Sequence, residues 1–465
     1  MSEMREERDS MGSVAVPADA LYGPQTARAV ANFPVSGWTL PREFIAAMGL
    51  IKQAAAAVHR KAARLDGDVA DAIVAAAQEV IDGRLDAHFP VDVFQTGSGT
   101  STNMNANEVI ASRAAQLLGG SAGDKVLVHP NDHVNMGQSS NDVFPTAMHL
   151  AAALTIHRGL VPALQALRET LTAKADEFDT VIKIGRTHFM DAVPIRLGQE
   201  FSGYAAQVDD ALSFLGRAVG ALCELPIGGT AVGTGLNAPD HFDAEMCRVL
   251  SAKTALQLRP APNHFAAQGA RDAALLASAM LRSVAVALGK IASDIRLMGS
   301  GPRCGLGELL LPAVQPGSSI MPGKVNPVIC ETLVQVACQV IGCDAAIAAG
   351  ATGGVGSILD LNVAMPMIAW NLLTQIRLLT NAAATFKVRC LDGLQADRQR
   401  CETLVEQSLA MITSLVPTIG YDAAAEIAKE AHATGKTIRQ ICTEKNLLPQ
   451  AELDDLLDAE AQTGT

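Results

Sequence analysis

Hydrophobic residues recur at every third or fourth position over long stretches in the central part of the chain. The repeating positions are Leu160, Leu164, Leu167 and Leu171, then Val284, Leu288, Ile291 and Ile295, then Ile368, Leu372, Ile376 and Leu379. This spacing places the apolar side chains on one face of a helix. Long helices with such faces can bury them only against one another, which predicts a helical bundle between about 140 and 395.

The sequence on either side of this region has a different pattern. Residues 1–139 contain shorter helical windows, near 43–63 and 69–81, separated by joints rich in glycine and proline. After Cys390, a polar stretch leads into short amphipathic windows near 399–413 and 422–432. Possible strands such as 181–184 are too few for a parallel sheet with crossovers. We therefore predict an all-α protein with a mostly helical N-terminal domain (1–139), a central helical bundle (140–395) and a small C-terminal helical domain (396–465).

Composition narrows the classes of partner. The 465 residues include 48 acidic and 36 basic side chains, a formal charge of −12, which argues against a nucleic-acid surface. The 9 cysteines form no C-x-x-C pair, so the sequence indicates neither a disulfide framework nor a zinc or iron–sulfur ligand set. The N-terminal residues lack an apolar signal segment and apolar runs are interrupted, so we expect a cytoplasmic protein without a membrane partner.

Four segments concentrate hydroxyl, amide and glycine residues. They are 96–107 (TGSGTSTNMNAN), 129–142 (HPNDHVNMGQSSND), 185–191 (GRTHFMD) and 317–327 (GSSIMPGKVNP). We expect each to lie just before a helix, where unsatisfied N–H groups and the helix dipole favour anions. A single segment of this kind is most simply a capped helix. Four of them, which include Arg186, His188 and Lys324, predict a site for a small anion.

Nucleotide and metal sites find no support in the sequence. The stretch GSSIMPGK fails as a P-loop, because Pro322 stands at the second glycine position and Val325 follows Lys324. The glycines at 97–99 and 233–235 lack a third glycine and a preceding strand. His129 and His133 have the spacing of two metal ligands on a helix, but the residues between them favour a turn. We expect neither a cofactor nor a metal.

The chemistry that remains is proton transfer on an anionic substrate. Backbone N–H groups, Lys324 and Asn326 can hold carboxylate oxygens. Ser318 or Ser319 can act as a base if a cation and backbone dipoles stabilise the alkoxide. For His188, which Thr187 and Asp191 accompany, the residues alone leave a catalytic and a structural role equally open.

These segments resemble those of the fumarase/aspartase superfamily. GSSIMPGKVNP resembles its signature loop, and TGSGTSTNMNANEV, HPNDHVN-x-x-QSSND, GRTH-x-x-D and GGTAVGTGLN together resemble class II fumarases. Aspartate ammonia-lyases share the loop but typically have alanine, threonine and glutamine where Ser98, Ser140 and His188 stand. The resemblance covers nearly the whole chain and favours a fumarase.

The resemblance implies a three-domain helical protein whose bundles form a homotetramer, with each active site shared between three subunits. The reaction would be the metal-independent, reversible hydration of fumarate to L-malate, a step of the tricarboxylic acid cycle. Ser318 would remove the C3 proton of malate, and Lys324 would stabilise the aci-carboxylate. His188, polarised by Glu331, would protonate the leaving hydroxyl through a water. The dicarboxylate would be bound by Ser98, Thr100, Ser139, Ser140, Asn141, Thr187, Lys324 and Asn326, and a second anion site would contain His129, Asn131 and Asp132.

The shared site also has support that does not depend on the resemblance. Successive bundle helices run antiparallel, so the helix starts near 141 and 195 should lie at opposite ends. One chain can hardly bring all four segments together, and oligomerisation through the bundle offers a solution.

Several residues depart from the pattern of the family and bear on the substrate preference. Val126 and Leu127 stand where basic residues are usual, Asp360 replaces the usual glutamate and Met365 the usual lysine. His133, Arg196 and the segment 265–273 are also unusual. Two alternatives therefore remain: an ammonia-lyase for aspartate or a related amino acid, and a non-catalytic helical scaffold.

Overall fold

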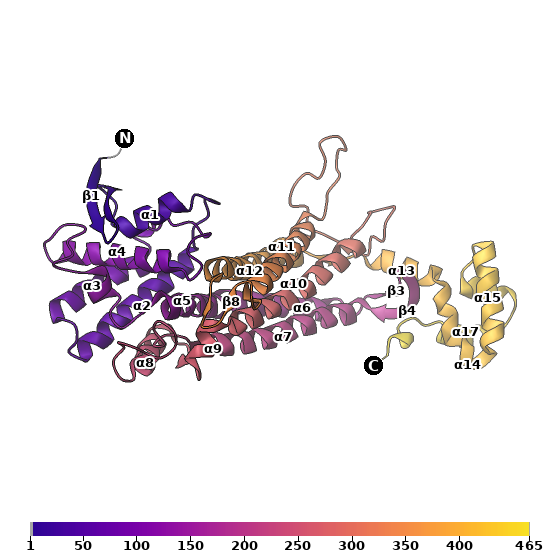
Figure 1. The fold of residues 1–465 in the computed structure, drawn as a ribbon. Coiled ribbons are helices and arrows are strands. Elements are labelled where there is room, and N and C mark those ends of the chain that lie inside the picture. The colour runs from indigo at the N-terminus through magenta and orange to yellow at the C-terminus, as the bar shows by residue number, and fades with distance from the viewer. Residues whose placement is uncertain (1–2, 465) are drawn as a thin grey trace. The chain divides into compact units, whose positions relative to one another are not determined.

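Helices dominate the computed structural model, which describes residues 3–464 (Figure 1). In this range the strands form only two-stranded sheets, so the predicted all-α class is confirmed. The helical windows predicted near 43–63 and 69–81 form α2 (Arg42–Lys61) and α3 (Gly67–Ile81). The possible strand near 181–184 belongs to β3 (Ile182–Thr187), which pairs antiparallel with β4 (Met190–Arg196).

The chain divides into two compact units, each built from separate segments. The first unit comprises Met1–Pro162, Ser213–Ala285 and Cys338–Thr380, and the second comprises Ala163–Leu212, Val286–Ala337 and Asn381–Thr465. The unit boundaries fall inside the long helices, which are α6 (Val161–Glu177), α7 (Leu197–Leu222), α10 (Asp272–Met298), α11 (Val328–Ala351) and α12 (Met365–Phe386). The division of the sequence into three consecutive domains remains a prediction.

The apolar faces predicted for the central region are confirmed. Every one of the repeating positions between Leu160 and Leu379 is at most 1% exposed. The first of these helices is continuous, because α5 (Ser140–Thr155), a π-helical turn (Ile156–Leu160) and α6 follow one another without a break. The periodic spacing of leucine and isoleucine therefore identified the buried side of each helix.

Three helical stretches are long and apolar enough, by length and composition alone, to cross a membrane. They are Ser140–Glu177, Asp272–Met298 and Val328–Ala351, and only 44%, 44% and 33% of their most apolar windows are buried within the structure. More than half of each window is therefore not buried within the single chain.

The first unit holds the N-terminal helices, which lie side by side in the indigo to purple part of Figure 1. Helix α2 packs against α3, α5 and α8 (Phe242–Thr254), and α4 (Thr100–Leu117) packs against α3. A hairpin of β1 (Met4–Asp9) and β2 (Gly12–Pro17), which we did not predict, precedes them. The other elements of this unit are α1 (Pro24–Asn32), a 3₁₀ turn (Asp86–His88), a π-helical turn (Pro130–Val134), β5 (Glu224–Leu225), β6 (Arg259–Pro260), α9 (His264–Gly269), β8 (Ser357–Ile358) and β9 (Leu361–Asn362).

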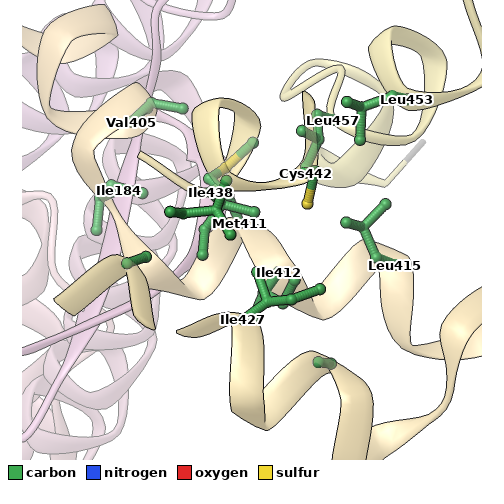
Figure 2. Packing of buried hydrophobic residues seen from close by; sticks show 13 residues of the cluster. Ile184, Val405, Met411, Ile412, Leu415, Ile427, Ile438, Cys442, Leu453 and Leu457 are labelled. Carbon is green, nitrogen blue, oxygen red and sulfur yellow. The ribbon is translucent and has the colours of Figure 1, made fainter. Parts of the chain in front are cut away.

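The second unit contains the β3–β4 hairpin and the C-terminal helices. Its elements after α12 are a π-helical turn (Lys387–Leu391), α13 (Arg398–Gln407), a 3₁₀ helix (Leu409–Leu415), α14 (Val416–Ile419), α15 (Tyr421–Thr434), α16 (Ile438–Glu444), α17 (Gln450–Leu456) and a 3₁₀ turn (Ala461–Thr463), with β7 (Leu309–Leu310) paired to β10 (Gln395–Ala396). Figure 2 shows the core of this region, in which Ile184 of β3 joins Val405, Met411, Leu415 and Leu453 of the C-terminal elements. Burial of Ile184 in this core fixes β3.

Arg196, one of the unusual residues, ties the end of β4 to the C-terminal segment. Its guanidinium donates to the carboxylate of Asp179 (2.9 Å), to Oγ1 of Thr463 (3.0 Å) and to the carbonyl of Gly464 (3.0 Å). The hairpin is therefore anchored through both strands, by Ile184 on β3 and by Arg196 on β4.

Candidate active site

The N-termini of α4 and α5 meet in the first unit. The hydroxyl groups of Ser98, Thr100 and Ser140 lie there in a row, which we call the hydroxyl cluster. Oγ of Ser98 lies 2.9 Å from Oγ1 of Thr100, which lies 2.7 Å from Oγ of Ser140. The close approach requires glycine at position 99, because a Cβ there would lie 2.0 Å from the ring of Phe144 and the residue has φ +72°. The N-termini of two helices create a positive electrostatic potential where they converge, and the hydroxyl groups add hydrogen-bond donors. Both features favour the binding of a carboxylate.

The start of α5 is held by a buried carboxylate. Ser139 and Asp142 form a capping box, in which the N–H of Ser139 donates to Asp142 (2.9 Å). The other carboxylate oxygen of Asp142 accepts from the N–H groups of Gly228 (3.0 Å) and Thr230 (2.9 Å), and the Asn141 amide donates to a carbonyl of the same loop (2.8 Å). Burial raises the pKa of Asp142 to about 6, although the N–H donors oppose the rise. The GGTAVGTGLN motif therefore supports residues 139–141, which we predicted to bind the substrate.

The predicted turn at His129 is confirmed and takes the form of one π-helical turn, Pro130–Val134. Nδ1 of His129 accepts from the N–H groups of Asn131 (3.3 Å) and Asp132 (3.1 Å), and Nδ1 of His133 accepts from the N–H of His129 (3.0 Å). The three residues predicted for a second anion site are thus neighbours in one turn, where His129 acts as the cap.

His188 sits at the tip of the β3–β4 hairpin. The segment 185–191 thus forms a hairpin, and our expectation that it lies directly before a helix was wrong, because β4 intervenes before α7. Both turn residues, His188 (φ +57°) and Phe189 (φ +60°), adopt left-handed backbone conformations without being glycine. The strand pairing Thr187↔Met190 closes this tight turn, which normally favours Asn-Gly. Strain of this kind is characteristic of functional positions, and Thr187 and His188 are exposed.

A buried ion network fixes β3 beneath the hairpin tip. Lys183, only 1% exposed, contacts the carboxylates of Glu200 (3.0 Å) and Glu308 (3.4 Å), and Arg186 contacts Glu308 (2.8 Å). Burial raises the pKa of Glu200 against the opposing effect of Lys183. A cavity of about 670 Å³ in the second unit is lined by Lys183, Arg186, Glu200 and His188.

The loop 317–327 leads into α11 (Figure 1) and is closed by its own polar groups. The N–H of Gly317 donates to the carbonyl of Lys324 (2.8 Å), and the Asn326 amide donates to the carbonyl of Gly317 (2.8 Å). Lys324 also donates to the Asn326 side chain. Oγ of Ser318 accepts from two backbone N–H groups, those of Ile320 (3.2 Å) and Met321 (3.0 Å). These donors face the oxygen that would become an alkoxide.

The structure thus brings the predicted residues together in separate groups. Ser98, Thr100, Ser139, Ser140, Asn141, His129, Asn131 and Asp132 belong to the first unit, and Thr187, His188, Ser318, Lys324, Asn326 and Glu331 belong to the second. Among the residues described within one chain, no hydrogen bond joins His188 to Glu331, which lies in the first turn of α11.

Met365 is in contact with a residue of the unusual segment 265–273. Nη1 of Arg271 lies 3.5 Å from Sδ of Met365, and both side chains are buried. Burial lowers the pKa of Arg271 to about 9. Val126, in contrast, is 92% exposed.

Sequence reasoning missed the residues that support the site: Lys52, Asp142, Lys183, Glu200 and Glu308. Lys52 did leave a signal, because it is a single charge inside the otherwise apolar window around Ile51 and Ala54. Between residues 3 and 464, no group of three or more histidine, cysteine, aspartate or glutamate side chains is arranged to hold a metal ion.

Comparison with known proteins gives matches along nearly the whole chain. A family model described as lyase matches residues 12–342, and one described as fumarase C C-terminus matches residues 411–464. The chain is 53% identical over 464 residues to a class II fumarate hydratase of Halobacterium salinarum, covering 100% of this chain and 98% of that protein. It is 54% identical over 454 residues to the class II fumarate hydratase of Mycobacterium tuberculosis, covering 97% and 94%.

Two solved structures also match over nearly the whole chain. The recombinant class II fumarase from Schistosoma mansoni superimposes with a TM-score of 0.95 at 42% identity and covers 98% of both chains. A fumarate lyase:delta crystallin from Brucella melitensis, bound to cobalt, gives 0.95 at 45% identity and covers 100% of both.

Proposed function

The chain belongs to the class II fumarate hydratase family of lyases, and from that premise we propose how its residues carry out the reversible hydration of fumarate to L-malate. The observation that carries the proposal is the position of Ser318, whose Oγ receives two backbone N–H donors. Such donors stabilise a developing alkoxide, as an oxyanion hole does. Ser318 is therefore the base that removes the C3 proton of malate.

The negative charge that develops on the substrate moves onto the carboxylate next to C3. Lys324 and Asn326, which contact each other in the same loop, bind this aci-carboxylate. His188 works through a water and protonates the hydroxyl that leaves C2, and Glu331 polarises its imidazole. In the hydration direction the same groups act in reverse: the water adds to C2 and Ser318 returns the proton to C3.

The hydroxyl cluster of the first unit binds the substrate. Ser98, Thr100, Ser140 and Asn141 surround the converging helix starts, and Ser139 caps one of them. Thr187 adds a donor beside the catalytic histidine. The turn at His129, Asn131 and Asp132 is the second anion site. No cofactor or metal takes part.

We also propose that the chain assembles into a cytoplasmic homotetramer through its long helices. This is supported by the large unburied share of the apolar helices α10 and α11 and by the division of the site residues between groups that share no hydrogen bond within the described chain. In the assembly, His188 of one subunit would meet Glu331 of another. Light scattering should give four times the mass of the chain, and an active monomer at high dilution would contradict the shared site.

The activity itself is tested by following the ultraviolet absorbance of the conjugated double bond. Purified protein is added to L-malate, to L-aspartate, and to fumarate with or without ammonia. We expect fumarate to form from malate and not from aspartate. Formation from aspartate alone would instead identify an ammonia-lyase, and inactivity on every substrate would favour a non-catalytic scaffold.

A further inference from the structure

Lys52 is a fully buried cation next to the substrate-binding segment of the first unit. Its side chain is 0% exposed and lies in the middle of α2. Nζ donates to Oδ1 of Asn103 (2.8 Å), Oδ1 of Asn135 (2.9 Å) and Oε1 of Gln138 (3.0 Å). All three partners are neutral amides, so no carboxylate is bonded to this charge.

The hydrogen bonds of the partners fit an ammonium group at Lys52. The Asn135 amide nitrogen donates to the carbonyl of Gln138 (3.2 Å), so its oxygen must face Lys52. The Gln138 amide nitrogen donates to the carbonyls of Val134 (3.1 Å) and Met136 (3.2 Å), so its oxygen must also face Lys52. Three acceptors require three N–H donors, which only the protonated form has. The cost of burial is visible in the pKa of Lys52, which falls to about 7.

The residues that Lys52 holds form the turn immediately before the start of α5. His59 lies two helical turns after Lys52 on the same face of α2. It also contacts this turn, because its Nε2 lies 2.7 Å from the carbonyl of Met136. Ser139 follows Gln138 directly and caps α5. Helix α2 therefore fixes the turn that positions Ser140 and Asn141 at the start of α5.

The charge next to this turn is compensated only in part. Asp142 is also fully buried, and its attraction for Lys52 is already shared with three backbone N–H donors. A buried cation is costly unless it is paired. An anion bound at the hydroxyl cluster would add the missing negative charge at the helix start.

We propose that Lys52 is a positioning residue for dicarboxylate binding: it holds the turn 135–138 and supplies positive potential to the start of α5. This inference rests on the proposed function. It predicts that Lys52 acts on substrate affinity more than on the chemical step, which belongs to other residues.

The first experiment compares Lys52→Met with Lys174→Met. Lys174 in the other unit is the control, because it is also buried (8% exposed) and donates to the backbone carbonyl of Leu394 (2.7 Å). Unlike Lys52, it also pairs with a carboxylate, that of Glu177 (2.8 Å). In Lys52→Met we expect KM for malate and the inhibition constant of succinate to rise at least about tenfold. The reason is that the turn 135–138 loses its hydrogen bonds to a charged group. We expect kcat to change less than KM. Lys174→Met should alter the melting temperature with KM within about twofold of wild type.

A second variant keeps the proposal testable if Lys52→Met does not fold. Asn103→Asp preserves the oxygen that Lys52 contacts and adds a buried negative charge beside the ammonium group, which cancels the positive potential. The ion pair that it forms offsets the loss of the hydrogen bond from the Asn103 amide to Oδ1 of Asn135 (3.2 Å). We expect a higher KM and weaker succinate inhibition with an unchanged or higher melting temperature. Unchanged KM values in the folded variants would overturn this inference. The proposed function would still stand in that case, provided that the wild-type chain is active on malate. A wild-type chain that is inactive on malate would remove the proposed function first.

Discussion

Replacing Ser318 by alanine separates catalysis from structure at the loop 317–327. The substitution removes one oxygen that accepts two N–H groups, at 3.2 and 3.0 Å, on a loop whose neighbouring side chain Ile320 is 84% exposed. The structural loss is therefore at most about 1 kcal/mol, or roughly 1–2 °C in the melting temperature of a chain this long. Loss of the base should reduce turnover by about two to four orders of magnitude. Succinate binding should change little, because Lys324 and Asn326 remain.

The control for this experiment is the neighbouring serine. Ser319→Ala alters an exposed side chain in the same loop, and we expect wild-type turnover. Turnover is measured by absorbance in both directions, succinate affinity by calorimetry and stability by thermal melting. If Ser318→Ala retains near-normal turnover and loses only stability, Ser318 is merely a turn cap and the proposed base is wrong.

The other predictions concern a second catalytic residue, a buried carboxylate and metal dependence. His188→Asn should lower turnover by about two to four orders of magnitude with an unchanged melting temperature, and an unimpaired variant would leave His188 as a turn residue. Because burial raises the pKa of Asp142 to about 6, the native state binds more protons than the unfolded state between about pH 4 and 6, so the free energy of unfolding falls as the pH rises through that window. Asp142→Asn should remove about 3 kcal/mol of this fall, and denaturant unfolding of both proteins at pH 4 and 7 should show the difference; parallel profiles would contradict it. Exhaustive chelation should leave turnover unchanged, whereas activity lost and restored by a divalent metal would refute the metal-independent mechanism.

Local patterns in the sequence identified the helices and their buried faces. The leucine and isoleucine repeats are buried because helix periodicity depends only on the chain itself. The cap at Ser139 follows from the local QSSND motif for the same reason. The loop 317–327 was likewise found from its glycine, serine and proline content, and α11 begins at Val328 directly after it.

Contacts between distant segments could not be predicted in this way. The sequence His188-Phe189 lacks the Asn-Gly signature of a tight hairpin turn, so only the packing of β3 against the C-terminal helices makes the turn necessary. Lys52 contacts residues 51 to 86 positions away, and no local rule connects α2 with the turn 135–138. The resemblance supplied the catalytic roles, but it did not reveal the groups that hold those residues in place.

The left-handed backbone at the hairpin tip has a consequence for the engineering of this protein. Each non-glycine residue in that conformation costs about 1–2 kcal/mol, and His188 and Phe189 pay it side by side. The proposed mechanism requires the imidazole of His188, whereas no step of it uses the ring of Phe189. We therefore expect Phe189→Gly to relax the turn and raise the thermal stability while His188 stays in place. The strain at both positions marks the tip as a place where the fold gives up stability for the position of the histidine.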